Sequence, residues 1–194
     1  MKRGASSGPP DASLNAGIMR TVTILGALAL AALLPLQATT LQILSVDTMV
    51  AKSTLIVRAR PTPVSSFQRA GLIYTSYRLD VSATLKGSAV TNLQVAVPGG
   101  NYQGLHQAVA GSPGLQAGAD YVFFVWTAPS GSNYIIGLSQ GLFEVHTNSS
   151  GAVVLTRGPA DAKTLDAAGG TVSDNGVTLP LTDLQAKIAQ GGKP

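Results

Sequence analysis

The sequence predicts an all-β fold with a minor α component: a small antiparallel β-barrel of five to six strands, with a short N-terminal helix and a C-terminal helix. Many short apolar segments follow one another, and turn residues rather than regular helices separate them. The longest segment, residues 73–86, alternates apolar and polar side chains along its whole length. Such an alternation is typical of a bent strand in a barrel or a sandwich, and we expect the barrel.

The domain is predicted to begin with a short helix. Ser45 can act as its N-cap, and Asp47 is favourable in its first turn. Residues 53–60 then alternate apolar and polar side chains and form the first predicted strand. We expect Pro61 and Pro63 to end the hydrogen-bond ladder of this strand, because proline has no amide hydrogen to donate.

Further strands are predicted after the long segment, at residues 93–97, 121–126, 134–138, 142–146 and 152–156. A glycine-rich connection over residues 98–119 follows the first of these strands, and turn residues join the others into two hairpins. The sequence Asp174-Asn175-Gly176 predicts the turn of a smaller ribbon. The apolar strand 121–126 is expected to place its aromatic side chains, Phe123, Phe124 and Trp126, in the core.

The C-terminal segment predicts a closing helix. Thr182 and Gln185 have the spacing of a capping box, and Gly191 with Gly192 ends the helical pattern. An apolar stripe is formed by Leu181, Leu184 and Ile188.

The N-terminal part predicts export. Residues 22–36 are apolar and uncharged and follow Arg20, which is the layout of a secretory signal. This run of 15 residues is shorter than the roughly 20 that a membrane-spanning helix needs. We therefore expect cleavage after Ala38 and a periplasmic or extracellular product, with an uncleaved anchor as the alternative.

Two domains of different character follow from this interpretation. Residues 1–38 comprise a disordered extension and the signal, and residues 39–194 form a single β-barrel domain. Translation can begin at Met1 or at Met19, since Met19 with Arg20 would open a compact signal by itself.

Composition excludes several classes of function. The chain has no cysteine, so it forms no disulfide, no thiolate metal site and no cysteine nucleophile. After Ala38 there are ten Lys and Arg against eight Asp and Glu, without the basic cluster that a phosphate backbone requires. We expect no nucleic-acid partner, no cofactor, no metal and no membrane association after signal removal; the oligomeric state stays open.

Three stretches carry a resemblance to a known family: STLIVRAR at 53–60, YRLDVSATLKGS at 77–88 and LQAGADYVFFVW at 115–126. In order and character they resemble netrin-like domains, the OB-fold barrels that include the tissue inhibitors of metalloproteinases. The resemblance covers roughly half of the chain after the signal and implies an OB-like barrel. Those inhibitors reach their metal through an N-terminal cysteine, which this chain lacks. The chain also resembles uncharacterised exported bacterial β-rich proteins through its LKG, VPGG and GLSQG segments.

The GLSQG segment, Gly137-Leu-Ser139-Gln-Gly141, matches the G-x-S-x-G pattern of a nucleophile elbow. An elbow needs a helix after the serine, but a strand is predicted there. One hypothesis is a small serine hydrolase in which Ser139 acts with His106 or His146. The alternative, which we favour, is a glycine-flanked strand corner.

Two further groups of residues are candidate sites. Glu144 and His146 share a strand face and could hold a metal, but the expected role is the polar outer face of a hairpin. The candidate ligand-binding residues are Gly99, Gly100, Tyr102 and His106, at the rim of a binding face; the alternative is a plain connection that needs positive φ at its glycines.

The function expected from the sequence is therefore that of an exported, non-enzymatic β-barrel domain. It is expected to bind a protein or polymer at the cell envelope or outside, through loop 98–119 and one barrel face. The alternatives are the serine hydrolase and a structural subunit of a surface assembly.

Overall fold

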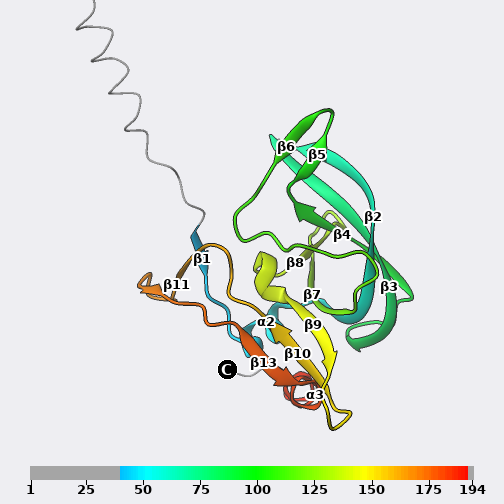
Figure 1. The fold of residues 1–194 in the computed structure, drawn as a ribbon, viewed down its shortest axis with the longest axis vertical. Helices are drawn as coiled ribbons and strands as arrows, with labels where there is room; N and C mark the ends of the chain where they lie inside the picture. The colour runs from blue at the N-terminus through cyan, green and yellow to red at the C-terminus, as the bar shows by residue number, and fades with distance from the viewer. Residues whose placement is uncertain (1–39, 192–194) are drawn as a thin grey trace, which may run out of the picture. The chain divides into compact units, whose positions relative to one another are not determined.

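A computed structural model describes residues 40–191 of the chain (Figure 1). The predicted extension, export signal and cleavage site lie outside the described residues, so these stay predictions. Between Thr40 and Gly191 no helix is long and apolar enough to cross a membrane.

The secondary structure is mostly β. In chain order the elements are β1 (Thr40–Gln42), α2 (Val46–Lys52), β2 (Leu55–Arg69), β3 (Leu72–Lys86), β4 (Asn92–Pro98), β5 (Gly100–Tyr102), β6 (Leu105–Gln107), β7 (Tyr121–Thr127), β8 (Asn133–Ile135), the 3-10 helix η1 (Leu138–Gly141), β9 (Leu142–Thr147), β10 (Val153–Arg157), β11 (Lys163–Leu165), β12 (Thr171–Val172), β13 (Val177–Pro180) and α3 (Leu181–Ala189).

Five strands close into a barrel in the order β7-β2-β3-β4-β8, with β8 pairing back onto β7. The predicted small barrel with a short N-terminal helix and a C-terminal helix is confirmed. One junction differs from the antiparallel expectation: β4 and β8 run parallel and meet at Ala96 and Tyr134. Strands β9, β10 and β13 extend the same sheet outward from β7 (Figure 1).

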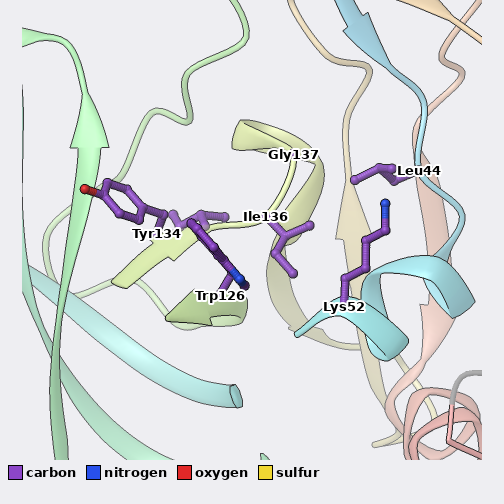
Figure 2. Close-up of a pocket in the computed structure, with 7 residues that line it drawn as sticks. Leu44, Lys52, Trp126, Tyr134, Ile136 and Gly137 are labelled. Carbon is purple, nitrogen blue, oxygen red and sulfur yellow. The ribbon is translucent and has the colours of Figure 1, made fainter. Parts of the chain in front are cut away.

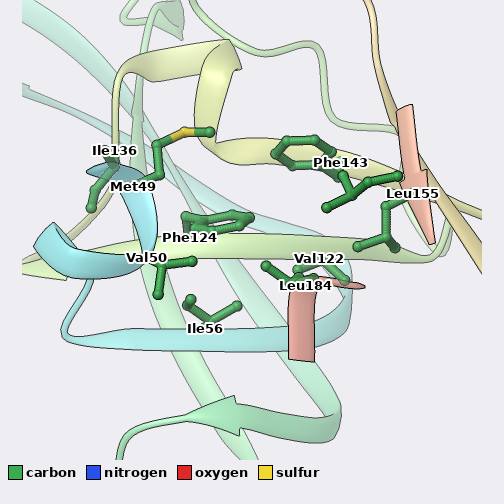
Figure 3. Packing of buried hydrophobic residues seen from close by; sticks show 10 residues of the cluster. Met49, Val50, Ile56, Val122, Phe124, Ile136, Phe143, Leu155 and Leu184 are labelled. Carbon is green, nitrogen blue, oxygen red and sulfur yellow. The ribbon is translucent and has the colours of Figure 1, made fainter. Parts of the chain in front are cut away.

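Strand β7 is apolar from Tyr121 to Val125, where both of its faces are buried. One face points into the barrel, where Phe123 and Val125 are fully buried. The other face, with Val122 and Phe124, packs in a second core against the helices and the outer strands (Figure 3). There the rings of Phe124 and Phe143 lie 5.4 Å apart. Phe123 and Phe124 thus occupy the core, as predicted.

Strand β2 does not end at its prolines, which corrects the sequence prediction. Pro61 pairs with Leu79 and the ladder with β3 continues to Arg69. Beyond Ala59, however, β7 no longer pairs with β2. The carbonyl of Pro61 accepts a hydrogen bond from Gly118 on the side away from β3, so the missing amides of Pro61 and Pro63 face that open side.

The segment 174–176 is not a hairpin turn, contrary to the prediction. Strand β12 pairs with β11, whereas β13 pairs with β10. The two strands that flank the segment therefore belong to different sheets. The side chain of Asp174 instead binds Arg157, at the end of β10, at 2.6 Å.

The C-terminal helix exists, but it starts differently from the prediction. Its N-cap is Pro180, and no side chain caps it. Thr182 therefore lies inside the first turn and not at the cap, so the capping box is wrong. The apolar stripe is confirmed, because Leu184 is fully buried and its two neighbours pack against the same core. The amide of Gly191 closes the helix on Ile188.

Lys86 caps the C-terminal end of α2. Its ammonium group donates to the carbonyls of Val50 and Ser53, at 2.6 and 2.7 Å. These carbonyls lie at the negative end of the helix, where a cation is favourable. We expect Lys86→Met to lower the free energy of unfolding by about 1–3 kcal/mol in urea titrations. Lys163→Met, at an exposed strand position, is the matched control. Equal unfolding midpoints for the two variants would contradict this role.

Candidate binding face

Trp126 is not a core residue, which corrects the prediction. Its side chain is 44% exposed. It lies on the same face of β7 as Phe124, two residues further along the strand. The helical cover that buries Phe124 does not bury Trp126, so the indole ring emerges at the surface of the barrel.

Four aromatic side chains form a continuous row on the outer face of the barrel. This aromatic row consists of Phe67, Tyr74, Tyr134 and Trp126. Phe67 pairs with Tyr74 across β2 and β3, and their rings stack at 5.5 Å. Trp126 pairs with Tyr134 across β7 and β8, at 6.2 Å. An edge contact of 6.4 Å between Tyr74 and Tyr134 joins the two pairs.

The small residues of β4 make this contact possible. Strand β4 lies between β3 and β8, and its Ala96 is opposite Tyr134. Because Ala96 carries only a methyl group, the ring of Tyr134 reaches Tyr74 across the intervening strand. The row therefore spans all five barrel strands, each of which is hydrogen-bonded on both sides at some point of its length.

A recess of about 430 Å³ opens beside the row. Tyr134 and Trp126 form one wall, and Leu44 and Lys52 stand opposite them (Figure 2). Ile135, Ile136 and Gly137 complete the lining. A second recess of about 290 Å³ lies over β3 and β4, where Phe67 contributes to its wall. No carboxylate side chain lines either recess.

A chain of polar side chains fixes the strands that carry Trp126 and Tyr134. The hydroxyl of Thr54 is 2.9 Å from that of Thr127, next to Trp126. Thr127 in turn donates to Asn133, next to Tyr134, at 2.8 Å. The side-chain NH₂ of Asn133 then donates a hydrogen bond to the backbone carbonyl of Gln94 on β4, at 3.0 Å. These side-chain hydrogen bonds hold the ends of β7, β8 and β4 together, because only a few residues of β8 pair with the backbones of β7 and β4.

Gln140 positions the opposite wall of the recess. Its side chain is fully buried; its carbonyl accepts from the amide of Leu44 at 2.8 Å, and its NH₂ donates to the carbonyl of Gln42 at 3.0 Å. The segment that carries Leu44 is thereby held against η1. Gly137 leaves room for the Leu44 side chain, because a Cβ at position 137 would lie 2.9 Å from that side chain.

The predicted loop residues are brought only partly together. Gly99, Gly100 and His106 line a recess of about 380 Å³, but Tyr102 is not part of its wall. Residues 100–107 form the β5–β6 hairpin, in which Nδ1 of His106 lies 2.8 Å from the side-chain oxygen of Asn101. Both glycines have positive φ, and a Cβ on Gly100 would collide with Thr75. The glycines thus meet a backbone requirement of the connection.

Ser139 lies in η1, after β8 and before β9. Its hydroxyl oxygen is buried and has no hydrogen-bond partner among the described residues. None of the hydrogen bonds in residues 40–191 joins Ser139 to His106 or His146. A serine nucleophile requires such a base, so no geometric observation favours the hydrolase hypothesis.

Two other pairs of polar side chains lie outside the aromatic row. His146 and Glu144 lie 3.3 Å apart on the exposed face of β9, while Phe143 is buried on the opposite face. Asp120 binds Arg58 at 2.7 Å, and this hydrogen bond raises the pKa of the guanidinium group. Within the described part of the chain, no group of three or more His, Asp or Glu side chains could hold a metal ion.

Comparison with known proteins adds no further constraint: no protein-family model matches the sequence, and neither a curated protein nor a solved structure matches it.

Proposed function

We propose that this domain is a non-enzymatic binding module that holds an extended polymer across the outer face of its barrel. The observation that supports the proposal is the aromatic row, with its partly exposed Trp126 beside an open recess. If the predicted export signal operates, the polymer belongs to the cell envelope or its surroundings.

A row of neighbouring aromatic rings favours a ligand with repeated flat apolar faces. Partly exposed aromatic side chains bury a large area on binding and lose little conformational freedom. The row lies on a closed barrel, which offers a rigid platform. Strands β3, β4 and β7 each pair with a neighbour on both sides, so a ligand over them contacts side-chain faces; the open edge lies on β2 beyond Ala59, where β7 no longer pairs.

The proposal is tested by retention of the full chain in gels that contain one polymer each: a neutral glucan, a carboxylated glycan, poly-L-glutamate or single-stranded poly-dT. We expect at least one polymer to retard the protein, and Trp126→Ala to weaken that retention about tenfold or more. Tyr102→Ala is the matched control, since Tyr102 lies in the predicted loop but outside the row. Loss of retention only in Tyr102→Ala would place binding at the loop and contradict the proposal.

A further inference from the structure

The charges around the aromatic row indicate which polymer it holds. We propose, on the basis of the proposed function, that the ligand is an acidic polysaccharide whose sugar rings stack on Tyr134 and Trp126 while its carboxylates pair with Lys52 and Arg69. Two cations without acidic partners, one on each side of an aromatic pair, form a site for alternating apolar faces and negative charges.

Lys52 supplies the first cation. It is the last residue of α2, and its exposed side chain extends along the wall of the recess opposite Trp126 (Figure 2). It forms no ion pair with any residue of the described part. The carbonyls at the end of its helix are already bound by Lys86. The ammonium group of Lys52 is therefore available to a ligand in the recess.

Arg69 supplies the second cation. Its guanidinium group donates one hydrogen bond, of 3.0 Å, to the hydroxyl of Tyr134. It forms no ion pair within residues 40–191, so further donors are free for a carboxylate. The Tyr134 hydroxyl points away from Lys52 (Figure 2). The two cations thus flank the Tyr134–Trp126 pair on opposite sides.

The same features disfavour the other anionic polymers. A peptide would bring backbone amides and carbonyls that need partners, but Tyr134 and Trp126 lie on strands already paired with each other and with β4, and the open edge of β2 includes Pro61 and Pro63, which have no amide hydrogen to donate. A nucleic acid carries a charge at every phosphate and requires a broad basic surface, whereas acidic and basic residues nearly balance after Ala38. A sugar chain that carries carboxylates on its rings presents apolar ring faces to Tyr134 and Trp126 and negative charges to the two cations.

The test is calorimetric titration of the full chain with a galacturonate hexamer and with its methyl ester, which has the same backbone without the charge. We expect the acid to bind at least tenfold more tightly than the ester, with an affinity that falls as salt is added. Lys52→Met and Arg69→Met should each weaken binding of the acid several-fold and leave the ester unchanged. Trp126→Ala should weaken both ligands, and Lys163→Met, the control, neither.

The outcomes separate this inference from the function on which it rests. Equal affinity for acid and ester, or indifference to Lys52→Met and Arg69→Met, would overturn the acidic ligand and leave a Trp126-dependent polymer site. Trp126-dependent binding of poly-L-glutamate or poly-dT, without binding of either hexamer, would overturn the sugar assignment alone. If no polymer bound in a Trp126-dependent manner, both proposals would fall.

Discussion

Replacing Asp174 by asparagine is expected to destabilise the protein by about 3–5 kcal/mol, because it leaves the charge of Arg157 buried without a counter-charge. The exposed fractions of the Arg157 and Asp174 side chains are only 3% and 4%. The carboxylate accepts two hydrogen bonds from Arg157 and two more from the backbone amides of Ala160 and Gly176. An asparagine keeps the shape but supplies a neutral acceptor.

Urea unfolding at neutral pH measures this change. Asp161→Asn, at an exposed position that forms no ion pair within residues 40–191, is the matched control and should change the free energy of unfolding by less than about 0.5 kcal/mol. If Asp174→Asn lowered the free energy of unfolding by less than about 1 kcal/mol, the Arg157–Asp174 pair would not be structurally important.

The same pair makes stability depend on pH in a defined direction. Burial favours the neutral acid at Asp174, but hydrogen bonds from Arg157 and from the amides of Ala160 and Gly176 outweigh it, so the pKa is lowered. The stabilisation is fully present above the ordinary carboxyl pKa of about 4 and is lost as pH falls through the folded-state value. The difference between the natural protein and Asp174→Asn should therefore be constant near neutrality and shrink below about pH 4.

Replacing Gln140 by leucine is expected to have the second largest effect, a loss of about 2–4 kcal/mol, because two backbone groups lose their partners at once. The amide of Leu44 and the carbonyl of Gln42 depend on this side chain. Leucine preserves the volume, so the loss arises from hydrogen bonding and not from a cavity.

The control for Gln140→Leu is Gln185→Leu, at an exposed position of α3. In thermal or urea unfolding, Gln140→Leu should have a clearly lower unfolding midpoint than Gln185→Leu. Gln140→Leu should also weaken polymer binding, since Leu44 walls the recess beside Trp126. A variant with the stability of the Gln185→Leu control would contradict this account of the buried glutamine.

The fold was largely predictable because apolar alternation and turn residues both favour a small barrel. The errors lie where tertiary context overrides local rules. Pro61 and Pro63 are expected to break a strand, but β7 leaves that side of β2 open. Asp174 resembles a turn residue, but its charge is required by Arg157, which lies 17 positions earlier at the end of β10.

The aromatic row could not be recognised from composition, because exposure depends on how far the helical cover reaches along β7. A usable signal did exist. Phe67 and Tyr74 lie symmetrically about the Ala70-Gly71 turn, as Trp126 and Tyr134 do about a predicted turn, so each pair should face across its hairpin. The contact between the two pairs required the order of β3, β4 and β8.

The LKG, VPGG and GLSQG segments serve the structure in ways the sequence alone did not indicate. Lys86 of LKG caps α2, Gly100 of VPGG avoids a collision with Thr75, and Gln140 of GLSQG holds the segment before α2. Ser139 of GLSQG matches a catalytic pattern, but it is the side chain of the neighbouring buried Gln140 that forms hydrogen bonds, with the backbone of Leu44 and Gln42.

The central claim, that the aromatic row is a binding face, is tested most directly by the fluorescence of Trp126, the only tryptophan in the chain. Quenching by acrylamide is measured with and without each polymer of the retention panel. We expect a bound polymer to shield the 44% exposed indole and to lower the quenching constant at least twofold. A polymer that is demonstrably bound but leaves the quenching of Trp126 unchanged would contradict the account.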